Sequence, residues 1–269
     1  MRSIAWNPLL VFAEIWRHRY LLGQLIKRDV LLRYRGAMFG VAWIFFSPLI
    51  MLAIFAFIFG HVFQARWPQQ TDTMPFWVLL YVGLTTFNVF GETVARSPTS
   101  VRGYPNFVKK IVFPVEILPL VPLGAALVHA CFNLLILAAA LVWFGELRPQ
   151  FLLLPILIAP VVMLAIGMSW FLSAWGVFIK DMNQIVPVLV QMLLYLSPVF
   201  YPASAVPPAF QFLYAHNPLS IPVEAIRNAV TGHPIGWDSW ILALTIGLGV
   251  ALAGRFFFQH SREEFADAL

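Results

Sequence analysis

The sequence predicts an all-helical integral membrane protein with six transmembrane helices. Of its 269 residues, 61% are hydrophobic and only 11% are charged, and the mean hydropathy is +0.82. A single water-soluble core could not bury this much apolar surface. A bilayer core about 30 Å thick needs roughly 20 helical residues to cross. Six apolar stretches are candidates: Ala37 to Phe63, Phe76 to Ala95, Val115 to Phe144, Phe151 to Ile179, Ile185 to Tyr201, and Trp237 to Phe258.

The distribution of lysine and arginine predicts how these spans are oriented. With six spans, fourteen of the seventeen basic residues fall on one side of the membrane, and only Arg66, Arg148 and Arg227 fall on the other. Basic residues are retained on the cytoplasmic side of membrane proteins. We therefore expect both termini in the cytoplasm, with residues 1–36 before the first span, the spans within residues 37–258, and a cytoplasmic tail at residues 259–269.

Two segments outside the spans carry their own patterns. From Pro8 to Tyr20, large apolar residues recur at helical spacing beside basic ones, which favours an amphipathic helix in the cytoplasmic interface over a solvated helix. Residues 202–236 are rich in proline and too charged to cross the membrane alone. We expect a re-entrant hairpin on the outer side, with an ordinary loop as the alternative. Glu224 and Arg227 are the candidate outer-gate residues in this region.

Several kinds of chemistry have no support in the sequence. No lysine lies in a G-x-x-x-x-G-K-[ST] loop, so any ATP would have to be hydrolysed by a partner. Cys131 is the single cysteine, and the six histidines do not fall at metal-ligand spacing, so no metal site is predicted. Ser169 and Ser173 have no visible base beside them. The sequence therefore offers no positive evidence of catalysis, and we expect that the chain is not itself an enzyme.

Few polar groups lie within the predicted spans. Glu92 and Glu116 lie near the cytoplasmic ends of the second and third spans, where we expect ion pairs with Arg96 or Lys110. His129 and Asn133 are four residues apart, so they share one helix face and are expected to bond to neighbouring helices. A proton-coupled carrier usually needs titratable groups near the membrane midplane. Only His129 is available for that role.

Five segments resemble one family: the membrane subunit of ATP-binding-cassette type 2 polysaccharide exporters, which move O-antigen, capsule and teichoic acid chains. The resemblance covers nearly the whole chain, and the joint order of the segments is more specific than any one of them. They are LIKRDVLLRYRGAMFGVAW from Leu25 to Trp43, NFVKKIVFPVEILPL from Asn106 to Leu120, FIKDMNQIVPVLVQMLLYLSPVFYP from Phe178 to Pro202, HNPLSIPVEAIRNAVTG from His216 to Gly232, and the tail SREEFADAL.

The resemblance implies how such a chain would work. It implies a homodimer in the bacterial inner membrane with two cytoplasmic ATPase subunits, which would bind ATP and Mg, and no cofactor in this chain. It also implies that residues 100–113 form a coupling helix seated on the ATPase, with a turn at Pro114 into the third span. The candidate coupling residues are Arg102, Asn106, Lys109, Lys110 and Pro114.

The substrate of such exporters is a glycan on undecaprenyl pyrophosphate. The basic cluster Lys27, Arg28, Arg33 and Arg35 could hold that pyrophosphate by charge-assisted hydrogen bonds, although membrane topology alone would also produce these charges. The first and fifth spans would line the path, and their aromatic rings could stack on sugars or simply pack in the interface. The path candidates are Trp43, Phe46, Phe57, Gln191, Tyr195 and Tyr201. Alternatives are an exporter of another amphiphile, a lipid or a drug, and the proton-coupled carrier.

Overall fold

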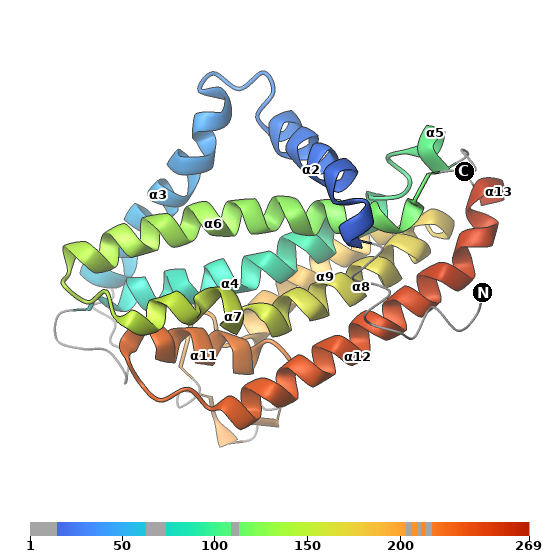
Figure 1. Cartoon of the computed structure of the whole chain (residues 1–269). Helices are drawn as coiled ribbons and strands as arrows, with labels where there is room; N and C mark the ends of the chain where they lie inside the picture. Colours follow the sequence, from blue (N-terminus) through green and yellow to red (C-terminus); the bar gives the residue numbers. More distant parts are fainter. Residues whose placement is uncertain are drawn as a thin grey trace.

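In a computed structural model of the chain, every regular element among the described residues is a helix (Figure 1). The structure describes residues 15–62, 74–108, 113–202, 206–208, 211–212 and 217–268. Most of the predicted interface helix from Pro8 to Tyr20 lies outside these ranges. The larger helices are α2 (Arg19–Arg33), α3 (Trp43–Phe55), α4 (Phe76–Arg96), α6 (Leu120–Trp143), α8 (Ala159–Phe178), α9 (Met182–Leu196), α11 (Ser220–Thr231) and α12 (Trp237–Ser261). Shorter helices are α5 (Pro105–Val108), α7 (Leu154–Leu157) and α13 (Phe265–Ala268).

Five continuous helical segments in the described part of the chain are long and apolar enough to cross a membrane. They are Gly40–Val62, Phe76–Thr99, Val115–Trp143, Pro149–Phe178 and Trp237–Glu264. These match five of the six predicted spans.

The predicted fifth span, Ile185 to Tyr201, corresponds to α9, which has 15 residues. At 1.5 Å per residue α9 is about 22 Å long, less than the hydrocarbon core of a bilayer. It ends at Leu196 with Ser197 as its C-cap, and Pro198 follows directly. The length of α9 therefore does not confirm a sixth span.

Glycine allows the closest helix contact, between α8 and α12. A Cβ built on Gly254 would overlap the carbonyl oxygen of Gly167, and one built on Gly167 would overlap the backbone of Val250. Small residues let membrane helices approach until their backbones touch, which gains van der Waals contact where apolar burial gains little. This pair forms one side of the bundle, and α12 runs along its length (Figure 1).

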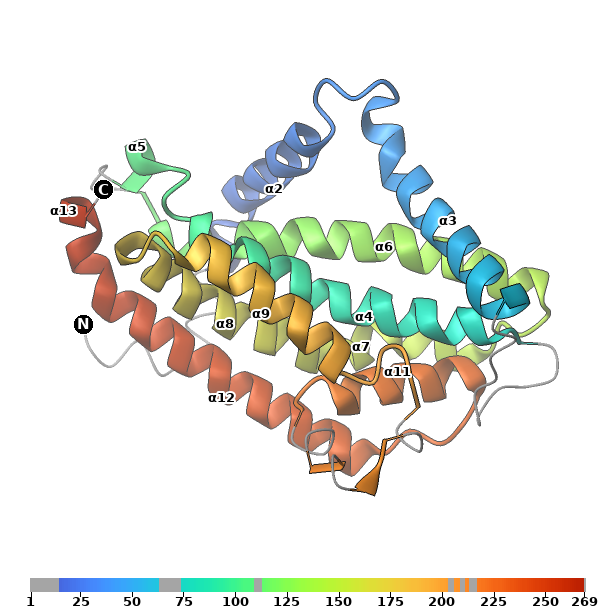
Figure 2. The ribbon, with the colours of Figure 1, turned by 180° about the vertical axis from the view of Figure 1, so that it is seen from behind.

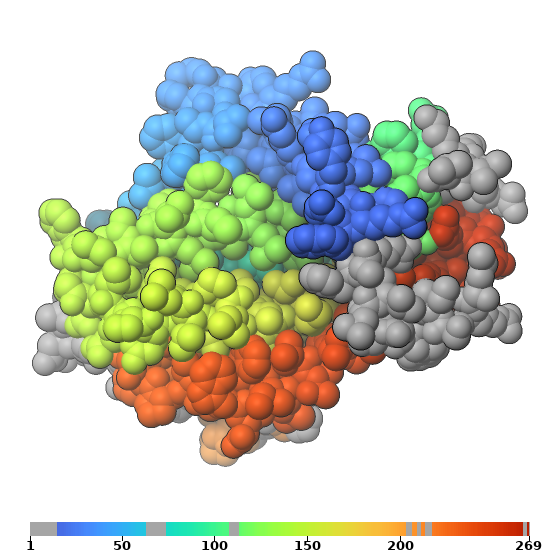
Figure 3. Space-filling model, viewed as in Figure 1, coloured from blue at the N-terminus to red at the C-terminus, as the bar shows by residue number. Residues whose placement is uncertain are grey.

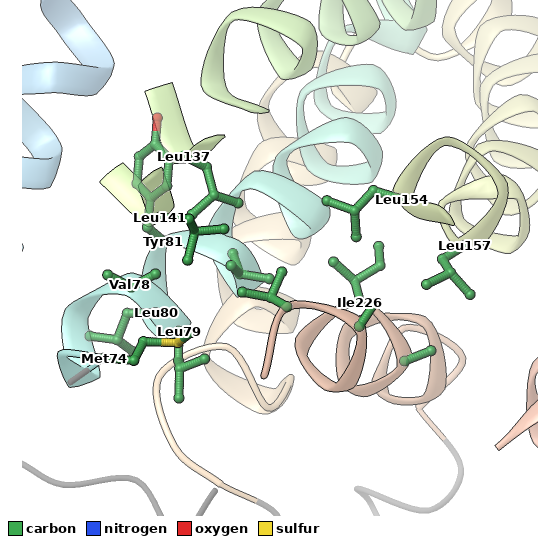
Figure 4. Close-up of a cluster of buried hydrophobic side chains, with 14 of the residues drawn as sticks. Met74, Val78, Leu79, Leu80, Tyr81, Leu137, Leu141, Leu154, Leu157 and Ile226 are labelled. Atoms are coloured by element: carbon green, nitrogen blue, oxygen red, sulfur yellow. The ribbon is translucent and has the colours of Figure 1, made fainter. Parts of the chain in front are cut away.

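Helix α4 lies at the centre of the bundle. In its most apolar stretch, 78% of the residues are buried, far more than in any other candidate span. At one end, side chains from α4, α6, α7 and α11 interlock around Leu79, Leu137, Leu157 and Ile226 (Figure 4). Helix α4 is therefore the central helix of the bundle, and α6, α7 and α11 pack against it.

Helices α2 and α3 form an inverted V beside α6 (Figures 1 and 2), and α2 packs against the bundle through the buried Leu25 and Val30. The corner between them contains Gly36 and Gly40, both with positive φ, 83° and 51°, which glycine adopts without strain. Only 11% of the residues in the apolar stretch of the Gly40–Val62 segment are buried. The V rises above α6 in the space-filling view (Figure 3). Helix α3 is therefore largely free of the rest of the chain.

Candidate functional site

One face of α2 is fixed to the bundle by two ion pairs. Asp29 and Arg33 are four residues apart and share a face of the helix. Arg96 donates to the Asp29 carboxylate at 2.7 Å, and Arg33 donates to the Glu92 carboxylate at 2.5 Å. Burial lowers the pKa of Arg33, but its hydrogen bond to Glu92 and the charge of that carboxylate outweigh this effect, so the pKa lies above its ordinary value. Arg33 therefore remains charged and keeps its ion pair with Glu92.

The ion pairs of Glu92 and Glu116 only partly follow the predicted partners. Glu92 lies 3.7 Å from the predicted Arg96, but its closer partner is Arg33. A ring nitrogen of His129 is 3.1 Å from the other oxygen of Glu92, so His129 bonds between helices as predicted. Glu116 pairs with Arg262, close to the C-terminus.

The opposite face of α2 lines a basic cavity. Lys27, Arg28 and Arg35 contribute to the wall of a space of about 650 Å³ that continues to Gly40 and Val41 at the start of the next helix. All three cations are exposed. Three of the four predicted pyrophosphate ligands thus lie together, whereas Arg33 is on the other face. We call this space the basic cavity.

A second space of about 650 Å³ lies between α3, α4 and α6. We call it the polar cavity because each of these helices adds polar groups to its wall. The hydroxyl of Tyr81 donates to the side-chain oxygen of Asn133 at 3.2 Å, which satisfies part of that amide. Tyr34 lines both cavities, and its hydroxyl lies 3.2 Å from a ring nitrogen of His129. The main polar residues are Ser47 on α3, Tyr81, Thr85, Asn88 and Glu92 on α4, and His129 and Asn133 on α6.

The predicted path residues fall on two exposed helix faces. Trp43 is the one member of that set in the wall of the polar cavity. Phe46 and Phe57 are 45% and 63% exposed. Gln191 and Tyr195 are exposed on α9, and the half-buried Tyr201 donates its hydroxyl to the Tyr195 carbonyl at 3.0 Å. These six residues do not converge on one cavity within a single chain.

The predicted coupling segment is anchored at its start. Ser97 donates to the Ser169 hydroxyl at 2.8 Å, and the hydroxyls of Ser100 and Ser173 lie 2.7 Å apart. These contacts join the end of α4 to α8, so the segment after residue 100 leaves from a fixed point.

The candidate coupling residues are placed only in part. Arg102 and Pro114 are partly exposed and Asn106 is exposed. Lys109 and Lys110 lie outside the described residues. Within the predicted helix of residues 100–113, the described part has the four-residue α5.

Aromatic contacts connect this segment to α2. The rings of Tyr104 and Phe107 are stacked with centroids 5.8 Å apart, and those of Phe107 and Phe113 are 4.7 Å apart. The guanidinium carbon of Arg28 lies 4.9 Å from the centroid of the Tyr104 ring, which is cation–π geometry. One wall of the basic cavity therefore contacts the predicted coupling segment.

The two candidate outer-gate residues lie on α11. Glu224 is partly buried, whereas Arg227 is 0% exposed. Arg227 donates to the carbonyl oxygens of Pro198 at 2.5 Å, Val199 at 2.7 Å and Leu79 at 3.3 Å, and to the Glu224 carboxylate at 3.1 Å. The arginine thus holds α11 to α4 and to the chain after α9.

Within the described ranges, no group of three or more His, Cys, Asp or Glu side chains could hold a metal ion. Sequence reasoning did not single out Tyr34, Ser47, Tyr81, Thr85 and Asn88 in the polar cavity, or Tyr104 beside Arg28. The available signal for Asn88 was an amide near the end of the apolar run FWVLLYVGLTTFNVF, from Phe76 to Phe90. No sequence pattern marked Tyr104 as a partner of Arg28, because that contact joins residues far apart in the chain.

The long apolar helices define a multi-pass membrane protein. A family model described as "ABC-2 type transporter" matches residues 20–231, well over half of the chain, so the protein belongs to the ABC-2 type transporter family. Membership makes the chain a membrane subunit that catalyses no bond change itself, and implies a separate ATPase partner.

Named relatives cover almost the whole chain. The protein is 25% identical over 264 residues to the O-antigen export system permease protein RfbA of Myxococcus xanthus, which covers 95% of this chain and 98% of the relative. Identity to RfbA of Klebsiella pneumoniae is 24% over 93% of this chain and 95% of the relative. The polysialic acid transport protein KpsM of Escherichia coli is 24% identical over 85% of this chain and 90% of the relative.

Proposed function

We propose that the protein is the membrane subunit of an exporter that moves a polysaccharide linked to undecaprenyl pyrophosphate across the bacterial inner membrane. Two copies would form a homodimer with two ATPase subunits, which bind ATP and Mg. Both termini lie in the cytoplasm, on the side of the basic residues. The end-to-end similarity to O-antigen permeases supports the polymer over a drug or another lipid as cargo.

The observation that carries the proposal is the basic cavity. Lys27, Arg28 and Arg35 present three positive charges in one concave space beside the first span. A pyrophosphate is a compact polyanion, and charge-assisted hydrogen bonds from arginine and lysine are the contacts that hold such groups. A carrier lipid whose undecaprenyl tail lies in the bilayer beside the first span would place its pyrophosphate at this cavity. The basic cavity is thus the proposed site for the carrier's headgroup.

Two of the three exposed cations can be tested against an exposed arginine of α2 that lies outside the basic cavity. Arg28→Ala and Arg35→Ala should reduce stimulation of the reconstituted ATPase complex by pyrophosphate-linked glycan, and leave the response to unlinked glycan unchanged. Arg19→Ala is the control, because Arg19 is exposed on α2 but lies outside the basic cavity. If Arg19→Ala has the same effect as Arg28→Ala, general charge attraction explains the result and the headgroup site is wrong.

Coupling to the ATPase needs a separate test. We propose that Arg102, Asn106, Lys109, Lys110 and Pro114 belong to the surface that meets the ATPase. Reversing Lys109 and Lys110 together to glutamate should leave the protein inserted and the ATPase bound, but uncouple ATP hydrolysis from export. Export at the normal rate in that variant would show that the segment does not couple the two.

Movement along the path follows from the same arrangement. ATP-driven closure of the partner subunits would push on residues 100–113 and shift α3 and α9 of the two subunits apart. Phe46, Phe57, Gln191, Tyr195 and Tyr201 would then face the sliding glycan, with Trp43 at the entrance. Glu224 and Arg227 would bound the outer end of the path, with Arg227 acting as the fixed member of the pair because it is wholly buried.

A further inference from the structure

The polar cavity exposes uncharged polar side chains of two candidate membrane-spanning helices. Asn88 lies in the central part of the Phe76–Thr99 segment, and it is exposed although its neighbours Phe87 and Val89 are only 2% and 1% exposed. Ser47 is exposed on α3 across the same cavity. Both side chains therefore face the cavity and not the core of the bundle.

These groups need hydrogen-bond partners that the described chain does not supply. Among the described residues, neither the Asn88 amide nor the Ser47 hydroxyl has a hydrogen-bond partner. An amide carries two donors and one acceptor, and hydrocarbon satisfies none of them. Polar residues at membrane depth are retained where they face a watery or functional space. These groups therefore favour a polar occupant, either water or a polar ligand.

The geometry of the cavity fits a sugar next to a carrier headgroup. Its volume of about 650 Å³ lies within the range of about 300–1,000 Å³ that ligand pockets span. Amides and hydroxyls on its walls match sugar hydroxyls, which both donate and accept. Trp43 adds an aromatic face against which the C–H face of a sugar ring can pack. Tyr34 lines both this cavity and the basic cavity.

We infer that the polar cavity binds the sugar nearest the pyrophosphate, so that one subunit holds headgroup and first sugar side by side. This rests on the proposed function, because it takes the headgroup to occupy the basic cavity. Asn88 and Ser47 then set specificity for the first sugar, independently of the path at the dimer interface. The subunit would thus recognise the bond between the pyrophosphate and the first sugar, which occurs once in each lipid-linked glycan.

The test compares two carriers in the reconstituted complex: undecaprenyl pyrophosphate without sugar and the same carrier with its glycan. In the unmodified protein, the glycan-bearing carrier should stimulate ATP hydrolysis at a lower concentration than the bare carrier. Asn88→Leu should raise the half-saturating concentration of the glycan-bearing carrier about tenfold, as expected for the loss of one or two good hydrogen bonds, and leave that of the bare carrier unchanged. Ser47→Ala should give a smaller shift of the same kind.

Thr245→Val is the matched control. Thr245 is an exposed polar residue in the α12 span, and its hydroxyl bonds to the Ile241 carbonyl of its own helix at 2.8 Å. It should shift neither carrier. Equal potency of the two carriers on the unmodified protein, or an equal shift for both in Asn88→Leu, would overturn the sugar site and leave the headgroup site standing. No stimulation by either carrier would refute the proposed function itself.

A second measurement does not depend on activity. Cys131 is the single cysteine, so Cys131→Ser gives a background without thiols for Asn88→Cys. A small, charged, water-soluble thiol reagent should label Asn88→Cys, and the glycan-bearing carrier should slow labelling more than the bare carrier does. Thr245→Cys, facing the lipid, should stay unlabelled. Failure of Asn88→Cys to react would show that lipid or the second subunit fills the cavity, and the inference would fall.

Discussion

Arg227→Met should be among the most destabilising single substitutions in the protein. The guanidinium is 0% exposed and donates to three backbone carbonyls and one carboxylate from three parts of the chain. A bond to a charged group contributes about 1.5–3 kcal/mol, but such values are not additive and part of the gain offsets the cost of burying the charge. Breaking a buried charged contact of this kind costs about 3–5 kcal/mol.

That free energy can be measured as a shift in melting temperature. For chains of roughly this size, 1 kcal/mol corresponds to about 2–4 °C, so Arg227→Met should lower the Tm of the detergent-purified protein by roughly 10 °C at a fixed scan rate. Arg227→Lys should recover only part of the loss, because an ammonium cannot reach several carbonyls with a planar fork.

A second substitution attacks the same contact from the other side. A Cβ on Gly83 would lie 2.5 Å from a terminal nitrogen of Arg227, so Gly83→Ala must displace the guanidinium. The two substitutions together should cost much less than the sum of their separate effects, because they disrupt one contact. If the Tm of Arg227→Met lies within about 1 °C of the original, Arg227 does not stabilise the fold through these contacts. The proposed outer-gate role would then be the remaining role for this residue.

Further predictions concern packing, the α2 ion pairs and the cysteine. Gly254→Ala should lower the Tm by several degrees, whereas Gly249→Ala on the same helix should be neutral, since a Cβ there meets nothing within 4 Å; equal effects would mean that close backbone contact does not hold α8 to α12. Asp29→Arg and Arg96→Asp should each weaken export and lower the Tm, and the double variant should recover part of both losses. In stabilities derived from the Tm, the coupling energy between the two substitutions should be about 1 kcal/mol. Additive losses would show that the pair is incidental. Cys131→Ser should change neither Tm nor export, because that thiol is exposed and unbonded.

The sequence was sufficient to locate five long apolar helices. Runs of apolar residues longer than a bilayer is thick are a strong signal, and five of the predicted spans appear as helices of membrane length. The boundaries differ by a few residues, as at α12, which starts at the predicted Trp237 and ends at Ser261 instead of Phe258. Composition could not settle the fifth span, because the apolar run after Ser197 continues without remaining helical.

The candidate site was less predictable, because its residues come together only through tertiary packing. The four cations from Lys27 to Arg35 look alike in sequence, yet the helix separates Arg33 onto the face that carries Asp29. Glu116 pairs with Arg262, which is 146 residues away, and the predicted partner Lys110 lies outside the described residues. Local patterns indicate which residues are polar, and the fold decides what those residues meet.

The sparse burial of α3 has an energetic consequence. Lipid tails are as apolar as the leucine and phenylalanine side chains of this helix, so α3 can exchange protein neighbours for lipid with almost no hydrophobic penalty. Most of the free-energy cost of moving α3 therefore comes from breaking polar contacts at the corner between α2 and α3. There, Arg33 pairs with Glu92 on α4 and the Tyr34 hydroxyl contacts His129 on α6. Moving α3 therefore costs little free energy except for breaking these few polar contacts. A small number of polar side chains can thus control the position of a whole membrane span.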